Sequence, residues 1–325
     1  MTDYRRLGNS GLSVSTVGLG CNNLGRAGTP TETQDGTNAV IGAAIDAGIN
    51  FFDVADIYGK APGTSEEMLG RALGGRRDDV VLATKFGADM GGANGPDWGA
   101  RGSRRYIVRA VESSLRRLGT DWIDLYQLHV PDRLTPIEET LSALDDLVHS
   151  GKVRYLGHSN FAGWQVAAAE LTASASGFTP FISAQNHYNL LDRRTENEVI
   201  PAAEAYGLGV LPYFPLANGL LTGKYRQGAV PEGSRLTHSR TSILEKADWE
   251  QLSVFRAFAD SRGLTEVQVA FSWLAAQPAV ASVIAGATTP KQVVQNASAV
   301  SWAPTVEDLD ELDRIFPRQP KSLLV

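Results

Sequence analysis

The chain has 325 residues, of which 43% are hydrophobic and 20% are charged, a composition typical of a soluble globular protein. Its formal net charge of −6 gives no electrostatic basis for binding nucleic acid or an anionic membrane surface. Cys21 is the only cysteine, so no intramolecular disulfide can form; with an N-terminus that lacks the apolar core of a signal peptide, this favours a cytoplasmic protein.

Short, nearly continuous apolar runs recur along the chain, and such runs are typical of strands covered on both faces in a parallel sheet. We predict strands at residues 15–20, 49–55, 80–86, 123–129, 153–159, 181–188, 209–214 and 281–286. Before them, the segment "YRRLGNSGLSVS" is expected to form a hairpin that turns at Asn9-Ser10-Gly11.

Helical patterns lie between the predicted strands. The clearest one begins after Ser103, a suitable N-cap, carries apolar residues at three- and four-residue steps, and stops at Gly119. Another runs from Thr135-Pro136 to Gly151. Strands that alternate with helices, within a single regime of composition, predict an α/β fold: a (β/α)8 TIM barrel in one domain over residues 1–325. The N-terminal hairpin is expected to plug the barrel floor.

Residues 269–287 carry no charge and are nominally long enough to cross a bilayer. Gln277-Pro278 divides the stretch, since proline would break a continuous helix, so we interpret it as a buried helix followed by a short strand. Two connections, 87–102 and 217–248, are long and follow strands. They therefore belong on the catalytic rim of a barrel, where long loops are usually functional.

Four polar side chains are predicted to converge on this rim. Asp53, Lys85 and His129 end three successive strands, and Tyr58 follows the strand that Asp53 ends. A free phenol has a pKa near 10. An ammonium at about 4 Å, at an effective dielectric of about 20, stabilises phenolate by roughly 4 kcal/mol, or about 3 pK units, and desolvation opposes this shift.

These groups suit the protonation of an oxygen atom while its carbon accepts hydride. Asp53 would keep Lys85 charged and aimed at Tyr58, and His129 could polarise a carbonyl. Taken singly, an aspartate or lysine at a strand end is usually part of a loop ion pair, so the prediction depends on the four occurring together. The other histidines show no spacing typical of metal ligands, so no metal site is predicted.

The segments "NFFDVADIYG", "VVLATKFG" and "DLYQLHVPD" resemble the aldo-keto reductase family, in particular its bacterial reductases and potassium-channel β-subunits. The resemblance continues through most of the chain. It implies NADPH-dependent reduction of an aldehyde or ketone by a catalytic tetrad of Asp53, Tyr58, Lys85 and His129. Tyr58 would be the general acid, Lys85 and Asp53 its tuning pair, and His129 the residue that orients the carbonyl.

The same resemblance implies which residues hold the cofactor. In "GHSNF" and "SAQNHYN", Ser159, Asn160 and Gln185 would bind the nicotinamide carboxamide, and Tyr213 in "PYFPL" would stack on the nicotinamide ring. Gly20, Cys21 and Asn22 would lie under the ribose. The implied cofactor contacts are Gly20, Cys21, Asn22, Ser159, Asn160, Gln185, Tyr213, Phe214, Pro215, Leu216, Lys224, Gly286, Thr288, Gln292 and Asn296.

The phosphate end departs from the family pattern. Phe214 stands where serine is frequent, so only its backbone N–H could serve the pyrophosphate. "GATTPKQVVQN" resembles the adenosine-binding motif, but the basic residue that often grips the 2′-phosphate is absent at Thr288 and Gln292. Lys291 or Lys224 could supply that charge instead. The favoured cofactor is NADPH, with NADH left open.

The substrate, a small-molecule carbonyl compound, is expected to lie against Trp98, with Asn22 or Asn23 and Phe161 or Trp164 framing the pocket together with Tyr58 and His129. Two alternatives stay open. One is a nucleotide-binding, redox-sensing subunit with incidental turnover, which the lack of a long N-terminal extension disfavours. The other is a metal-dependent barrel hydrolase that uses Asp53, Asp56 and His129.

Overall fold

The computed structural model of the chain describes residues 3–231, 236 and 241–319. Within these ranges, eight parallel strands form one sheet in the order β10-β3-β4-β5-β6-β7-β8-β9. They are β3 (Val17–Gly20), β4 (Phe51–Asp53), β5 (Val81–Phe86), β6 (Ile123–Leu128), β7 (Val153–Ser159), β8 (Phe181–Gln185), β9 (Gly209–Val210) and β10 (Val283–Gly286).

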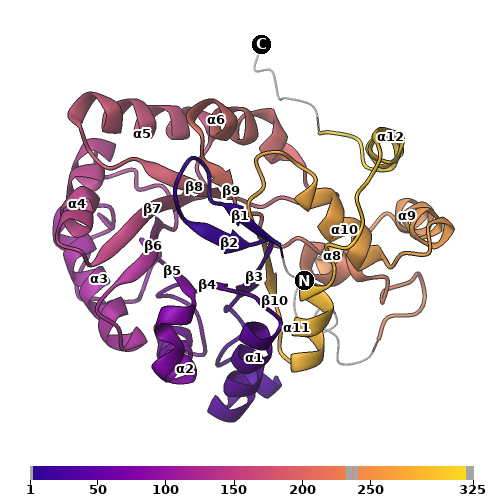
Figure 1. Ribbon diagram of the computed structural model, residues 1–325, viewed down its shortest axis with the longest axis horizontal. Coiled ribbons are helices and arrows are strands. Elements are labelled where there is room, and N and C mark those ends of the chain that lie inside the picture. Colours follow the sequence, from indigo (N-terminus) through magenta and orange to yellow (C-terminus); the bar gives the residue numbers. More distant parts are fainter. Residues whose placement is uncertain (1–2, 232–235, 237–240, 320–325) are drawn as a thin grey trace.

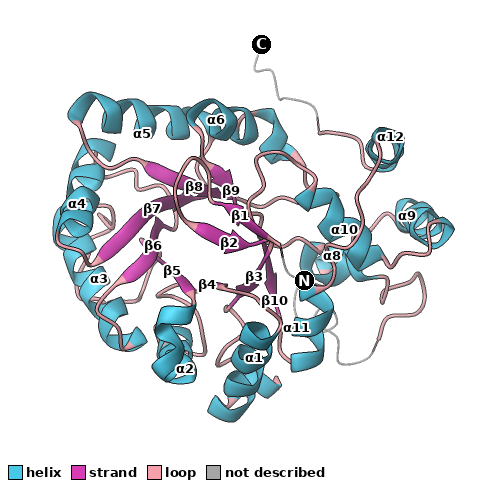
Figure 2. Cartoon of the chain, viewed as in Figure 1, coloured by secondary structure: helices cyan, strands magenta, loops and turns pink. Residues whose placement is uncertain are grey.

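The sheet curls into a barrel with the helices outside it, as Figure 1 and, by element type, Figure 2 show. Parallel bridges from Val210 to Val280 and from Tyr213 to Ile284 link the two ends of the sheet. The predicted (β/α)8 barrel is confirmed. The α-helices are α1 (Gln34–Asp46), α2 (Thr64–Leu73), α3 (Arg104–Leu118), α4 (Ile137–His149), α5 (Gly163–Ser176), α6 (Val199–Tyr206), α8 (Ser242–Glu245), α9 (Trp249–Ser261), α10 (Glu266–Ala275), α11 (Pro290–Ala297) and α12 (Val306–Ile315).

Short 3₁₀ helices complete the connections; they are η1 (Pro30–Glu32), η2 (Gly74–Asp79), η3 (Arg194–Asn197) and η4 (Ala217–Thr222). The predicted helix boundaries hold at α3, where the Ser103 side chain accepts a hydrogen bond from the Tyr106 backbone N–H. Gly119 ends α3 with φ of 64°, a left-handed conformation that glycine adopts without strain.

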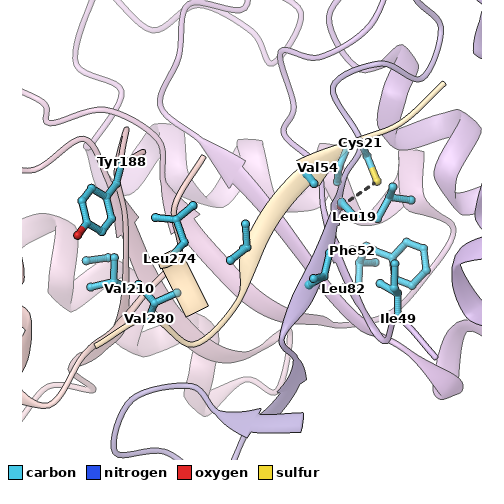
Figure 3. Close-up of a cluster of buried hydrophobic side chains, with 14 of the residues drawn as sticks. Leu19, Cys21, Ile49, Phe52, Val54, Leu82, Tyr188, Val210, Leu274 and Val280 are labelled. Carbon is cyan, nitrogen blue, oxygen red and sulfur yellow. Dashed lines mark hydrogen bonds between the residues drawn. The ribbon is translucent and has the colours of Figure 1, made fainter. Parts of the chain in front are cut away.

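Residues along each strand alternate between the two faces of the barrel wall. Phe52 and Leu82 point outward into the large core between sheet and helices, part of which Figure 3 shows. Their neighbours Phe51 and Ala83 belong to a second, smaller cluster inside the barrel. This alternation decides which side chains line the interior.

The predicted hairpin is present: β1 (Tyr4–Arg6) pairs antiparallel with β2 (Ser13–Ser15). Leu7 and Val14 are fully buried in the interior cluster beside Phe51, and the Asn9 backbone N–H donates to the Gly207 carbonyl at 2.8 Å. That the hairpin plugs the barrel floor stays a prediction, and these contacts are consistent with it.

The uncharged stretch 269–287 divides as expected, with its first part in α10 and its last part in β10. Phe271 and Trp273 of α10 are buried in the core. Within the part of the chain that the structure describes, no helix is long and apolar enough to cross a membrane.

Candidate active site

A layer of polar side chains lies above the apolar interior cluster because the inward-facing positions continue at two-residue steps. Phe51 is followed by Asp53, and Ala83 by Lys85. Leu125 is followed in the same way by Gln127, and the strand register pairs Lys85 with Gln127. These side chains come from β4, β5 and β6, and Gln185 joins them from β8.

Asp53 is the centre of this layer. Its Oδ2 accepts a hydrogen bond from Lys85 Nζ at 2.6 Å, and its Oδ1 accepts from the amides of Gln127 at 3.1 Å and Gln185 at 2.9 Å. Lys85 Nζ also donates to the Val54 carbonyl at 3.0 Å. A fully buried lysine is therefore paired with a carboxylate that is satisfied on both oxygens, as a buried charge requires.

Gly157 makes room for this layer. It faces inward on β7 in register with Gln127 on one side and Ser183 on the other. A Cβ at this position would lie 2.3 Å from Ser183 Oγ and 3.1 Å from Gln127 Cγ. Only glycine lets these two polar side chains approach so closely.

Tyr58, half-buried on the loop after β4, lies over the lysine: Lys85 Nζ is 5.1 Å from the centroid of the phenol ring. The expectation of a lowered pKa is wrong in direction. Burial raises the pKa of Tyr58 above its ordinary value, and the opposing charge of Lys85 does not reverse this. Tyr58 thus keeps its proton at neutral pH.

The Lys85 ammonium is stabilised in return. Burial favours its neutral form, but Asp53 and then Tyr58 outweigh burial and raise the pKa of Lys85 above its ordinary value. Lys85 therefore stays charged across the neutral range, with its positive charge beneath the phenol.

His129 completes the predicted tetrad. Its ring meets that of Tyr58 edge to face, with centroids 5.7 Å apart and an interplanar angle of 85°. Burial, helped by the charge of Lys85, lowers the pKa of His129 to about 3. The imidazole is therefore neutral at physiological pH, and a neutral imidazole keeps one N–H to donate.

The residues expected to hold a carboxamide form a connected group. Tyr213 Oη donates to Asn160 Oδ1 at 2.7 Å, and Asn160 Nδ2 donates to the His129 carbonyl at 2.9 Å and to Ser159 Oγ at 3.0 Å. Asn160 has φ of 62°, a left-handed conformation that asparagine tolerates better than most residues. Gln185 donates its amide N–H groups to Asp53 and Gln127, and its contact with a carboxamide stays a prediction.

The ends of β3 and β10 form a platform. Gly20 and Gly286 pair in register, and a Cβ on Gly286 would lie 2.7 Å from Asn23 Nδ2 and 3.4 Å from Asn22 Oδ1. The Asn23 side-chain oxygen is buried and has no hydrogen-bond partner among the described residues. Cys21, which follows Gly20 in the chain, is buried. Burial, and to a lesser extent the charge of Asp53, raises the pKa of its thiol well above the ordinary value.

The residues of the expected phosphate end are only partly brought together. Gln292 Oε1 accepts hydrogen bonds from the Thr288 N–H at 2.8 Å and hydroxyl at 3.0 Å, and Asn296 Nδ2 lies 3.5 Å from the Gly286 carbonyl. Lys291 is exposed on α11, whereas the Lys224 ammonium lies 5.0 Å from the centroid of the Tyr225 ring.

The turn after β9 carries the remaining expected cofactor residues. Phe214 has φ of 54° and stands edge-on to the Tyr213 ring at 5.1 Å. Pro215 is buried and Leu216 half-buried.

Of the aromatic residues expected to frame the substrate, Phe161 does not do so. It is 4% exposed and stacks on the buried His158 at 4.4 Å, inside the core. Trp164 is 68% exposed, and Trp98 is 73% exposed with the Arg105 guanidinium 4.3 Å from its ring. The substrate contact of Trp98 stays a prediction.

A second buried polar network escaped the sequence analysis. Glu66 accepts from Arg117 Nε and from Thr84 Oγ1, each at 2.6 Å. Arg117 also donates to Asn94 Oδ1 at 3.2 Å, and Asn94 Nδ2 donates to Asp56 Oδ2 at 3.1 Å. Burial, with the nearby charge of Glu66, raises the pKa of Asp56 to about 8, so its carboxyl is largely neutral.

This network ties the loop 87–102, through Asn94, to the chain just after β4. Asp56 lies three residues beyond Asp53 in the sequence. A second carboxyl so close to the tetrad was the one feature of the sequence that could have indicated this network. Among the described residues, no group of three or more His, Cys, Asp or Glu is arranged to hold a metal ion.

Fold and site together define a parallel (β/α)8 barrel protein whose strand ends carry a buried lysine–aspartate pair beneath a tyrosine and a neutral histidine. The chain belongs to the aldo/keto reductase family, whose model matches residues 16–316. The resemblance predicted from the sequence is confirmed.

Several curated proteins are similar over nearly their whole length. The oxidoreductase YrpG of Bacillus subtilis is 40% identical over 322 residues, which cover 97% of this chain and 96% of that protein. A probable voltage-gated potassium channel subunit beta of Oryza sativa is 36% identical, covering 98% of each chain. L-glyceraldehyde 3-phosphate reductase of Escherichia coli O157:H7 is 35% identical, covering 96% and 91%. Family membership and the reductases among these relatives support oxidoreductase activity.

Proposed function

We propose that this protein is a carbonyl reductase that uses a nicotinamide nucleotide, NADPH in preference to NADH, to convert an aldehyde or ketone to an alcohol. The observation that carries the proposal is the Lys85–Asp53 pair, with its 2.6 Å hydrogen bond, directly beneath Tyr58. Polar groups from the ends of adjacent strands meet there in one place.

Tyr58 is the proton donor. A phenol whose pKa lies above its ordinary value is fully protonated at neutral pH, so the proton is available whenever a carbonyl oxygen gains negative charge. The Lys85 ammonium then stabilises the phenolate that remains, and it stays charged because Asp53 holds it.

His129 orients the carbonyl. Because its imidazole is neutral, it donates a hydrogen bond without competing as an acid, and its ring lies next to that of Tyr58, as two donors to one oxygen require. In the overall reaction the carbonyl carbon receives a hydride and its oxygen receives the Tyr58 proton, which solvent later restores.

The cofactor supplies the hydride when it is bound. Several features of the chain suit a nicotinamide nucleotide: the flat face of Tyr213, the amide of Asn160 and hydroxyl of Ser159, and the glycine platform beside Asn23 with its unpartnered buried oxygen. The remaining candidates for nucleotide contacts are Gly20, Cys21, Asn22, Gln185, Phe214, Pro215, Leu216, Lys224, Gly286, Thr288, Gln292 and Asn296.

Tyr58→Phe tests the proposal. The substitution removes one oxygen and should lower kcat by about 10²- to 10⁴-fold with a simple aromatic aldehyde, the range of general acid catalysis, while NADPH still binds. The measurements are NADPH oxidation followed by absorbance and a fluorescence titration for cofactor affinity. Full activity in Tyr58→Phe would show that another group delivers the proton.

A second candidate function is a nucleotide-binding, redox-sensing subunit, and the probable channel β-subunits among the relatives favour it. Such a subunit would bind NADPH tightly and turn over slowly in the parent protein and in Tyr58→Phe alike. Multiple rapid turnovers that depend on Tyr58 favour the reductase.

We further propose that the whole chain acts as one domain in the cytoplasm on a small-molecule carbonyl compound. The single barrel and the continuous family match over residues 16–316 support this organisation.

A further inference from the structure

The loop after β8 places a histidine flat against Tyr213. The rings of His187 and Tyr213 are nearly parallel, with an interplanar angle of 10° and centroids 5.5 Å apart. We propose that His187 is a positioning residue that covers one face of the Tyr213 ring and so fixes the plane against which a flat ligand ring stacks. The inference rests on the proposed function, in which Tyr213 stacks on the nicotinamide.

His187 is itself held on both ring nitrogens. Its Nδ1 lies 3.1 Å from Asp192 Oδ2, and its Nε2 lies 3.1 Å from Asn189 Nδ2. Although burial opposes ionisation of Asp192, hydrogen bonds from Arg194 and from His187 keep the pKa of this carboxyl below its ordinary value. A charged acceptor therefore faces Nδ1 at neutral pH.

The orientation of the Asn189 amide decides which nitrogen carries the proton. Its Oδ1 accepts from the backbone N–H groups of Leu191 at 2.9 Å and Asp192 at 3.0 Å, and its Nδ2 also donates to the Phe214 carbonyl at 2.9 Å. Nδ2 therefore donates to His187 Nε2, and the imidazole proton lies on Nδ1, toward Asp192. A change of tautomer or a rotation of the His187 ring would break these two hydrogen bonds.

Further contacts fix the edges of the Tyr213 ring and its backbone. Its hydroxyl donates to Asn160, its backbone N–H donates to the Asn186 carbonyl at 3.1 Å, and Phe214 stands edge-on to it. His187 alone is recorded stacking parallel to the ring among the described residues. In the proposed function, the planar ring of the ligand lies against the opposite face of Tyr213.

His187→Ala should weaken NADPH binding and misplace the hydride donor. If Tyr213 moves so far that its stack on the nicotinamide is lost, the dissociation constant should rise by about 2- to 12-fold. Because catalysis depends on the angle at which hydride is presented, kcat should fall further than this, and the primary isotope effect with deuterated NADPH should grow. His187→Phe, which keeps a flat ring, should restore most of both properties.

His149→Ala is the matched control. His149 also pairs with an aspartate, Nδ1 lying 3.2 Å from Asp145 Oδ2, but it is an exposed residue at the end of α4, with no aromatic stack recorded among the described residues. It should leave the dissociation constant, kcat and isotope effect unchanged. Thermal unfolding of every variant checks that the fold is retained.

Two results would overturn the inference while the reductase function stands. One is a His187→Ala enzyme that binds NADPH and turns over like the parent, and the other is equal loss in His187→Ala and His187→Phe. If His187→Ala does not fold, Asp192→Asn, which keeps the ring but weakens its anchor, must still raise the dissociation constant. A parent protein that neither binds nor oxidises NADPH removes the proposed function and this inference with it.

Discussion

Lys85→Met gives the sharpest test of the site, because methionine is an unbranched side chain only one atom shorter than lysine and carries no charge. Lys85 is fully buried, and it donates to Asp53 and to the Val54 carbonyl. Breaking a buried ion pair on one side typically destabilises a protein by about 3–5 kcal/mol. We expect the lower part of this range, since Gln127 and Gln185 still donate hydrogen bonds to Asp53.

The effect on catalysis follows from the distance between the ammonium and the phenol. At the 5.1 Å separation of Lys85 Nζ from the Tyr58 ring centre, and an effective dielectric of about 20, the attraction for phenolate is about 3 kcal/mol. Loss of this stabilisation should slow proton transfer by roughly 10²-fold. NADPH affinity should change much less, because the lysine acts on the phenol.

Three measurements on Lys85→Met separate these effects: urea unfolding, a fluorescence titration with NADPH, and the single-turnover rate with an aromatic aldehyde. The double variant Asp53→Asn/Lys85→Met is the control, and it should recover stability without recovering rate, since no unpaired carboxylate is left. A loss of NADPH affinity as large as the loss of rate would refute the reasoning and make Lys85 a nucleotide-binding residue.

Two further predictions concern stability. Burial lowers the pKa of His158 to about 3 from an unfolded value of 6.5, so the unfolded chain binds the extra proton and stability should fall as pH drops below 6.5. At pH 5 the loss is about 2 kcal/mol, and in urea titrations His158→Leu should show that much less acid sensitivity than the parent; parallel curves would contradict this. The parent and His158→Leu must be compared at each pH, because Asp56 also makes stability depend on pH. Its pKa is raised to about 8, so its contribution to the free energy of unfolding falls as pH rises toward that value. Arg117→Met should destabilise the protein by about 3–5 kcal/mol, since it strands the fully buried Glu66 carboxylate, and a change below about 1 kcal/mol would show that Glu66 is readily neutralised.

The sequence was sufficient to predict the barrel because its strands read as apolar runs separated by helical patterns. It also predicted the meeting of Asp53 and Lys85, since each stands at the end of a run and the ends of parallel strands share one rim. Gln127 was missed because a glutamine within a strand has no titratable signature. Its contact with Asp53 depends on the interstrand register, which the sequence does not reveal.

Burial accounts for the other differences. The direction of the Tyr58 pKa depends on how far the phenol is removed from water. Desolvation was expected to oppose the charge of Lys85, but the sequence does not reveal the depth of burial that makes it the larger effect. Phe161 follows a strand, as a rim residue would, yet its ring turns back to stack on His158 in the core. His187 was noted only for lacking metal-ligand spacing, since its stack on Tyr213 joins segments that the sequence keeps apart.

The attachment of Asn94 divides the long loop 87–102 near its midpoint. Asn94 is hydrogen-bonded on one side to Asp56, on the loop after β4, and on the other to Arg117 of α3. A lid hinged only at its two ends would swing as a single piece. This loop is also held at Asn94, and its two halves are joined by an ion pair between Arg101, on the half with Trp98, and Asp89, on the half that leaves β5, at 2.9 Å. Any movement of the Trp98 half over a bound molecule must therefore break this ion pair or carry the other half with it.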